Sequence, residues 1–295
     1  VIKSEEIDIL LDASGFLFSD QWGFQHIRRN SESLLKKRST VKSLIFLPQA
    51  WGPFQSKDVK RYTEKLLSRA NLIFARDEVS YNHLRSLSLD LNVHIAPDFT
   101  ILTPSINDPC IPLPEKFVAI VPNSRMFDKS GNKNKYLEAM HSCIELLQKM
   151  GIKIVFVRHD REDSMVIDRL SINNKNIETI SHKDPRVMKW ILGKADFIIC
   201  SRFHALAGAL SLGVPSVAFG WSHKYPKLLE SFDCPELMIN QPYDIEMCND
   251  IIRQLINPQK LEEYSTRIKS AGNRLKDKLN NMWNIVENEI SKAID

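Results

Sequence analysis

Glycine is scarce in this sequence, and its scarcity limits the nucleotide-binding sites that the chain can form. Only 10 of the 295 residues are glycine, and they form neither a G-x-G-x-x-G nor a G-x-x-x-x-G-K-[ST] pattern. Both patterns cradle phosphates with glycine-rich backbone. The sequence therefore excludes a dinucleotide-dependent dehydrogenase and a P-loop nucleotide triphosphatase.

Long hydrophobic runs and paired cysteines are also missing. No stretch of about 18 apolar residues could span a bilayer, and the first residues lack the basic and apolar regions of a signal peptide. The five cysteines are far apart and include no C-x-x-C pair. We expect a reduced, cytoplasmic protein with no transmembrane segment, and association with the inner face of the membrane stays open. Because no initiating methionine is present, we expect the sequence to begin inside a longer gene product.

The charges and histidines exclude two further kinds of site. The formal net charge is +4, from 40 basic and 36 acidic residues, which is too small and too dispersed to indicate nucleic acid as a partner. The eight histidines are scattered, and no His/Cys/Asp/Glu cluster has the spacing of metal ligands. We therefore expect no metal.

Short apolar segments alternate with amphipathic segments along most of the chain. The predicted strands cover residues 7–12, 43–48, 72–76, 93–97, 117–122, 153–159, 196–200 and 216–220. The predicted helices include residues 57–70, 80–87, 135–150, 184–194 and 204–212. This alternation is typical of βαβ units and predicts an α/β fold with mainly parallel sheets.

A proline-rich segment predicts a boundary between two domains. Four prolines fall within residues 103–114, where they favour a stiff, extended connector. We expect an N-terminal domain over residues 1–108 and a C-terminal domain over residues 109–295. The charged helical segment from Pro258 onward either covers the second domain or packs back on the first.

The polar run Ser201-Arg202-Phe203-His204 lies where a buried strand is predicted to give way to a helix. Ser201 is expected to cap this helix, and the carboxyl ends of strands in open α/β sheets are where ligands bind. Arg202 supplies a permanent, fork-shaped cation for phosphate or carboxylate, and His204 exchanges a proton near neutral pH. The run therefore predicts an anion site with an acid/base group beside it.

The alternative interpretation of this run is structural: Arg202 pairs with a nearby acid and His204 caps the helix. A second apolar strand, ending at Gly220, is predicted soon after the helix. Unpaired charge between two core strands would be costly. We therefore favour a functional role.

At these residues the sequence resembles the polysaccharide pyruvyl transferases, which carry a serine-arginine-aliphatic-histidine motif before a small-residue helix and a Gly-Val-Pro strand. Further matches follow in order: Asp12-Ala-Ser-Gly15 with Asp20, Leu47-Pro-Gln-Ala-Trp-Gly-Pro53, Ala75-Arg-Asp-Glu-Val-Ser80, Ala96-Pro-Asp98 and Val121-Pro-Asn-Ser-Arg125. The resemblance implies two Rossmann-like domains in a GT-B-like arrangement. Two features depart from the family: its usual first strand is missing, so the N-terminal unit looks truncated, and Phe203 replaces the commoner leucine.

The resemblance also implies roles for individual residues. His204 and Arg202 would be catalytic, and Arg125 matches a substrate-binding arginine of the family. The other predicted substrate-binding residues are Ser124, Asn123, Phe203, Ser201, His159, Gly15, Gln49, Trp51 and Lys224. For several of them a structural role is an equal alternative: a solvated loop for Arg125, a hydrogen-bonded turn for His159, a buried aromatic for Trp51 and a surface turn for Lys224.

The function implied is transfer of an enolpyruvyl unit from phosphoenolpyruvate to a sugar of a polysaccharide or its precursor. The products would be a pyruvate ketal and phosphate, with phosphoenolpyruvate as donor substrate and no separate cofactor. The acceptor, free, nucleotide-linked or lipid-linked, and the oligomeric state stay open. Two alternatives remain: a GT-B-type nucleotide-sugar glycosyltransferase and a non-catalytic carbohydrate-binding protein.

Overall fold

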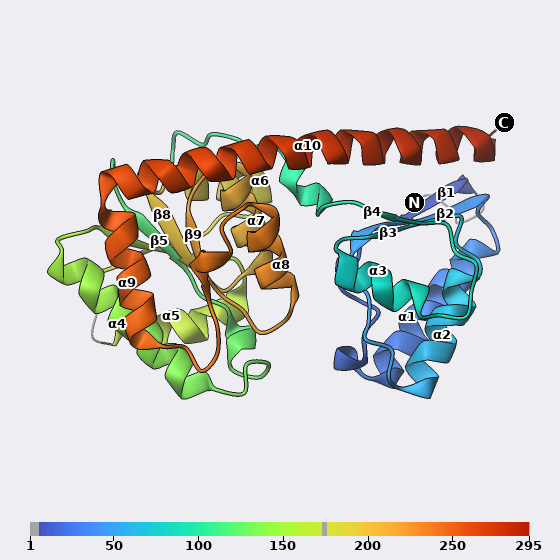
Figure 1. The fold of residues 1–295 in the computed structure, drawn as a ribbon, viewed down its shortest axis with the longest axis horizontal. Coiled ribbons are helices and arrows are strands. Elements are labelled where there is room, and N and C mark those ends of the chain that lie inside the picture. Colours follow the sequence, from blue (N-terminus) through green and yellow to red (C-terminus); the bar gives the residue numbers. More distant parts are fainter. Residues whose placement is uncertain (1–5, 173–175, 295) are drawn as a thin grey trace. The chain divides into compact units, whose positions relative to one another are not determined.

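The computed structural model describes residues 6–172 and 176–294, and these form two compact units (Figure 1). The first unit contains the chain as far as Phe99 together with the end of the chain from Lys276. The second unit contains Thr100–Leu275. The two units are described separately below.

The first unit is built on a parallel sheet. Its strands are β1 (Ile9–Asp12), β2 (Ser43–Gln49), β3 (Leu72–Ala75) and β4 (Val93–Ile95), in the order β1-β2-β3-β4. The helices α1 (Phe24–Arg38), α2 (Lys57–Leu67) and α3 (Glu78–Arg85) lie on one side of this sheet (Figure 1). Every residue of β2 and β3 is buried, which is typical of interior strands in a parallel sheet.

Aromatic side chains form the centre of the first unit's core. The ring of Trp51 stacks on Phe18 with centroids 5.3 Å apart and meets Phe46 edge-on at 5.4 Å. The indole Nε1 of Trp51 donates a hydrogen bond to the carbonyl oxygen of Phe74 at 3.1 Å. Without this bond the buried indole N–H of Trp51 would lack a hydrogen-bond partner. The loop after β2 is therefore held firmly in the core.

Gly52 lies in this loop at a position that has no room for a side chain. Its φ is +73°, and a Cβ atom there would lie 2.6 Å from Cγ of His83, whose Nδ1 is itself 2.8 Å from the carbonyl oxygen of Trp51. Gly23 has a similar φ, +77°, but nothing within 4 Å of the added atom.

Comparison of Gly52→Ala with Gly23→Ala separates the clash from the cost of the backbone conformation. We expect Gly23→Ala to cost about 1–3 kcal/mol, because φ +77° with ψ 155° is a conformation that residues with a side chain rarely adopt. Gly52→Ala should cost more because His83 must also move. Urea unfolding of both variants measures the two costs. Equal losses would show that the loop adapts to the added methyl group.

The second unit contains a six-stranded parallel sheet. Its strands are β5 (Val118–Val121), β6 (Ile154–Val157), β7 (Glu178–Ile180), β8 (Phe197–Cys200), β9 (Ser216–Phe219) and β10 (Met238–Ile239). The strand order is β10-β9-β8-β5-β6-β7. The chain thus moves outward from β5 in one direction and then returns to β8 and moves outward in the other. The junction of β5 and β8 is the topological switch point, where Rossmann-like sheets bind ligands.

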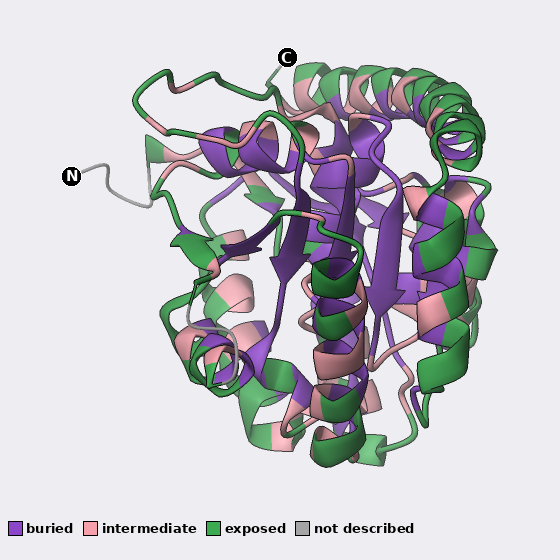
Figure 2. Ribbon diagram, turned by 90° about the vertical axis from the view of Figure 1, so that its left-hand side faces the viewer, coloured by how far each residue is buried: buried purple, intermediate pink, exposed green. Residues whose placement is uncertain are grey.

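Helices enclose this sheet on both faces. The helices α4 (Lys133–Lys149), α5 (Ser164–Ser171) and α9 (Ile245–Ile256) pack together, and α6 (Pro185–Gly193), α7 (Phe203–Ser211) and α8 (Lys224–Ser231) form the other group (Figure 1). All strands of this sheet except β7 are buried, while the outer faces of the helices are exposed (Figure 2). Asp184 caps α6 ahead of Pro185, and Asp244 caps α9, which are favourable helix starts.

The last helix, α10 (Pro258–Ile294), has 37 residues and contributes to both units. In its final turns Leu279, Met282 and Val286 are buried, a spacing that places them on one helix face. None of the helices among residues 6–172 and 176–294 combines the length and apolar character needed to cross a membrane.

The predicted α/β class with parallel sheets is confirmed. Two strands were missed, β7 and β10. Only one of the three residues of β7 is buried, and β10 has two residues, so neither offers a long apolar run to recognise. Helices α1, α8 and α9 were also not predicted.

Candidate functional site

Three polar loops of the second unit meet at the carboxyl ends of β5, β6 and β8. They begin at Asn123, Arg158 and Ser201. The loops after β5 and β8 flank the topological switch point and are directly bonded, since Asn123 Nδ2 donates to the Ser201 carbonyl oxygen at 2.9 Å. The sequence-predicted residues of this domain are therefore brought to one edge of one sheet.

Ser201 is a fully buried anchor of this edge. Its carbonyl oxygen also accepts a hydrogen bond from the Tyr225 hydroxyl at 2.8 Å, and its Oγ lies 2.9 Å from the Tyr136 hydroxyl. Burial raises the pKa of both tyrosines, so both hydroxyls keep their protons. The prediction that Ser201 caps α7 is wrong: Arg202 occupies the N-cap position, because the serine hydroxyl is used by Tyr136.

Asp163 is the central residue that sequence reasoning missed. Its carboxylate is fully buried and accepts from Arg202 Nε at 2.9 Å and Arg202 Nη2 at 2.5 Å. It also accepts from the backbone N–H groups of Ser124 at 2.9 Å and Asp160 at 3.1 Å. One carboxylate thus ties the loops after β5, β6 and β8 together and holds the Arg202 guanidinium in a bidentate geometry.

The ion pair shows that Arg202 does have the acidic partner that the structural interpretation required. Its side chain nevertheless remains 23% exposed, and a guanidinium has more donors than this carboxylate uses. His204 is exposed in the first turn of α7, while Phe203 between them is buried with its ring 5.7 Å from the His204 ring. The motif therefore presents Arg202 and His204 and buries Phe203 as an anchor.

His159, after β6, belongs to the same cluster. The residue as a whole is exposed, yet neighbouring groups desolvate its imidazole. This desolvation and the Arg202 cation lower the pKa of His159 from its ordinary 6.5 to about 4. His204 lowers this pKa further, and Asp163 raises it. The ring is therefore neutral at pH 7.

This shift makes the stability of the protein depend on pH. Between pH 6.5 and about 4 the unfolded chain takes up a proton at His159 that the folded chain does not. Because the unfolded state then binds more protons, stability falls as the pH is lowered through this range. Replacing His159→Asn removes this contribution.

We expect urea midpoints measured from pH 7 to pH 4.5 to fall less steeply in His159→Asn than in the wild type. His141→Asn, on helix α4, is the matched control and should keep the wild-type slope. Equal slopes in all three proteins would show that the folded His159 titrates normally.

The remaining predicted residues of this domain lie around the cluster. Arg125 is about half exposed and pairs with Asp128 at 3.3 Å and Glu162 at 3.8 Å. Ser124 is buried, and its Oγ has no hydrogen-bond partner among the described residues. Lys224 Nζ lies 5.1 Å from the centre of the Phe203 ring, within the range of a cation–π contact, so the lysine borders the Ser201–His204 run.

The predicted residues of the first unit lie at the carboxyl ends of β1 and β2. Gln49 is fully buried, and its Nε2 donates to Asp12 Oδ1 at 3.0 Å, while the carbonyl of Gly15 accepts from the Ala50 N–H at 2.9 Å. Trp51 is a core residue and is not accessible for stacking on a sugar. The buried-aromatic interpretation therefore holds for Trp51. Gln49 and Asp12 supply the polar side chains of this edge, and Gly15 supplies a backbone carbonyl.

Asp163 and the two tyrosines left only weak signals in the sequence. Asp160 and Asp163 form a capping box three residues apart, a pattern that marks a helix start. It does not reveal that the second carboxylate reaches Arg202, 39 residues further along the chain. Tyr136 lies in a helix that was read only as amphipathic.

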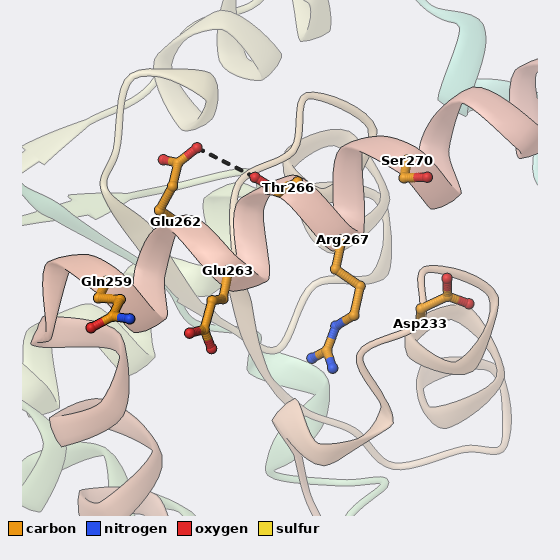
Figure 3. Close-up of a pocket in the computed structure, with 7 residues that line it drawn as sticks. All are labelled: Asp233, Gln259, Glu262, Glu263, Thr266, Arg267 and Ser270. Atoms are coloured by element: carbon orange, nitrogen blue, oxygen red, sulfur yellow. Dashed lines mark hydrogen bonds between the residues drawn. The ribbon is translucent and has the colours of Figure 1, made fainter.

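A hollow of about 690 Å³ lies elsewhere in the second unit, between α10 and the turn at Asp233 (Figure 3). Its lining has three acids and one base, and that base, Arg267, already bonds Glu236. Thr266 Oγ1 lies 3.3 Å from Glu262 Oε1. The lining therefore offers no excess positive charge to an anionic ligand. Within the described part of the chain, no group of three or more His, Cys, Asp or Glu residues is placed to hold a metal ion.

Several solved structures have a similar fold. S. aureus MnaA, solved with UDP, has a TM-score of 0.60 at 14% identity, over 94% of this chain and 74% of that chain. A putative UDP-N-acetylglucosamine 2-epimerase from Listeria monocytogenes has a TM-score of 0.60 at 12% identity, over 94% and 74%. The pneumococcal O-GlcNAc transferase GtfA has a TM-score of 0.58 at 11% identity, over 90% and 60%. These likenesses establish a GT-B-like fold.

The sequence itself was compared with curated proteins and with family models. No curated protein matched significantly. The family model for polysaccharide pyruvyl transferase matches residues 2–223, a span that includes the first sheet, the Asp163 cluster and the Ser201–His204 run. The chain therefore belongs to the polysaccharide pyruvyl transferase family of enzymes.

Proposed function

We propose that this protein transfers an enolpyruvyl unit from phosphoenolpyruvate to a sugar of a polysaccharide or its precursor, forming a pyruvate ketal and releasing phosphate. The observation that carries the proposal is the arrangement of Arg202 and His204 at the switch point, with Arg202 held by the buried Asp163. It places a fixed cation and a proton carrier side by side within the region matched to the family.

Phosphoenolpyruvate carries a phosphate and a carboxylate, so its binding requires several donors. Arg202 supplies a preorganised guanidinium, and Arg125 supplies a second, movable one at the same sheet edge. The buried Ser124 Oγ adds a hydroxyl whose hydrogen-bonding capacity is unused among the described residues. A buried polar atom without a partner is unfavourable, and a bound phosphate or carboxylate oxygen would relieve it.

The chemistry requires one proton carrier and stabilisation of the departing phosphate. His204 donates a proton to C3 of the enol, C2 becomes cationic, and a sugar hydroxyl adds to C2 and releases its proton to the base. The C2–O bond to phosphate then breaks with its electron pair on phosphate, and a second hydroxyl closes the ketal and loses its proton. Arg202 and Arg125 stabilise charge on the leaving phosphate.

Ligand binding gives a first test that needs no acceptor. We expect phosphoenolpyruvate to raise the melting temperature by several degrees, because at about 100 times its Kd a ligand adds about 2.7 kcal/mol of stability. Arg125→Gln should weaken this effect. Arg253→Gln is the matched control, since Arg253 is similarly exposed and also pairs with an acid three residues away. If phosphoenolpyruvate does not stabilise the wild type, that result counts against phosphoenolpyruvate as the donor substrate. It would favour a non-catalytic carbohydrate-binding protein.

A second candidate is a nucleotide-sugar glycosyltransferase, favoured by the fold neighbours that were solved with UDP. It predicts saturable binding of a sugar nucleotide and none of phosphoenolpyruvate. The same melting experiment distinguishes the two functions. Under the main proposal the protein acts in the cytoplasm, and its acceptor is a free, nucleotide-linked or lipid-linked sugar.

A further inference from the structure

A cleft lined mainly by basic residues lies beside the Arg202–Asp163 ion pair. The chemistry proposed above does not use this cleft. It has a volume of about 830 Å³ and is lined by residues 158–161 and 181–183, which follow β6 and β7. These are neighbouring parallel strands, so their carboxyl ends, and the loops that follow, face the same edge of the sheet. We call this feature the basic cleft.

Positive charge dominates the lining of the basic cleft. Arg158, Arg161 and Lys183 are permanent cations, whereas Asp160 supplies the one carboxylate of the lining. Asp160 lies 3.8 Å from Arg202 Nη2, so part of its charge is already offset. Clefts lined by one sign of charge concentrate ligands of the opposite sign.

The cations of the basic cleft are available because no acid among residues 6–172 and 176–294 forms an ion pair with them. Arg158 donates to the hydroxyls of Ser164 and Ser181, both at 3.1 Å, so neutral partners fix the guanidinium and leave its charge intact. Among the described residues, neither Arg161 nor Lys183 forms an ion pair, and both are exposed. The charges therefore come from both loops: Arg158 and Arg161 from the loop after β6, and Lys183 from the loop after β7.

The size of the basic cleft indicates a ligand larger than phosphoenolpyruvate. Clefts of about 300–1,000 Å³ hold ligands of drug size. Arginine and lysine on two facing loops suit two linked phosphate groups, because each loop can bind one of them. Asp160 connects the basic cleft to Arg202, so a ligand in it would extend toward the reacting groups.

We infer that the basic cleft binds a diphosphate, and, resting on the proposed function, that this diphosphate is carried by the sugar acceptor. The diphosphate then anchors the acceptor while its sugar reaches the Arg202 and His204 side chains. Both a nucleoside diphosphate sugar and a prenyl diphosphate sugar present this group. The cleft recognises the shared diphosphate.

The test is calorimetric titration of the full chain with inorganic pyrophosphate, without divalent metal and at fixed ionic strength. We expect Arg161→Gln with Lys183→Gln to weaken pyrophosphate binding at least about tenfold. Lys149→Gln, at the end of α4, removes an exposed charge outside the cleft and should bind like the wild type. All these side chains are exposed, and melting temperatures confirm that the variants fold.

Three results would overturn the inference: no pyrophosphate binding by the wild type, equal binding by the double variant, or binding of inorganic phosphate as tight as that of pyrophosphate. Uridine diphosphate and geranyl diphosphate identify the source, since the one that binds more tightly than pyrophosphate carries the natural group. Phosphoenolpyruvate is titrated separately. If pyrophosphate binds and phosphoenolpyruvate does not, the proposed function is contradicted and the diphosphate site stands. If phosphoenolpyruvate binds and pyrophosphate does not, only the present inference is contradicted.

Discussion

Arg202→Ala is expected to lower turnover at least about a hundredfold and to destabilise the fold as well. The loss of turnover follows from removing a positioned donor that stabilises developing charge. The loss of stability follows from Asp163, which is fully buried and would be left without its cationic partner. Breaking a buried pair in this way typically costs about 3–5 kcal/mol. Phosphate release and urea unfolding measure the two effects.

Because both effects come from one substitution, a second variant is needed to separate them. Arg202→Gln combined with Asp163→Asn removes both charges. The new amide oxygen can still accept from one of the two N–H groups, Ser124 N or Asp160 N, which bond different oxygens of the carboxylate. We expect this double variant to regain much of the lost stability and to remain at least about a hundredfold slow. Recovery of turnover along with stability would show that Arg202 has only a structural role.

His204→Ala is expected to lower turnover by about 10²–10⁴-fold with little change in stability. The rate effect is the usual size for loss of a general acid–base group. His204 is exposed at the start of α7, and exposed substitutions usually change stability by less than about 0.5 kcal/mol. Steady-state phosphate release at saturating phosphoenolpyruvate measures the rate.

His141→Ala provides the matched control for this variant, because it removes the same side chain from the helix α4 of the same unit. It should retain wild-type turnover. A His204→Ala protein that melts normally and turns over at the wild-type rate would remove His204 from the mechanism, and the neutral His159 would become the next residue to test.

The interior strands were predictable because their sequences are apolar on both faces. Strands β5, β6, β8 and β9 are buried at every position. The polar residues that follow these strands in the sequence could therefore be assigned to the carboxyl edge of a parallel sheet. The sequence therefore predicted that Ser124, His159 and Arg202 lie at one edge of the sheet.

What the sequence did not reveal was which groups pair across that edge. Asp163 bonds Arg202 across 39 residues, and Ser201 bonds Tyr136 instead of capping its own helix. Local patterns describe helix starts within a few residues, whereas these contacts depend on how separate loops pack. Trp51 illustrates the same limit, since an aromatic after a strand can face a ligand or the core, and here it stacks on Phe18.

The central claim is tested most directly by following the fate of phosphoenolpyruvate labelled with carbon-13 at C2. The purified protein is incubated with it and with hexose acceptors in free, nucleotide-linked and lipid-linked form, while NMR monitors carbon and phosphorus. We expect the wild type to produce a new ketal carbon signal and an equimolar amount of inorganic phosphate. We expect His204→Ala to produce neither. Consumption of a sugar nucleotide while the labelled phosphoenolpyruvate stays intact would contradict the proposed function.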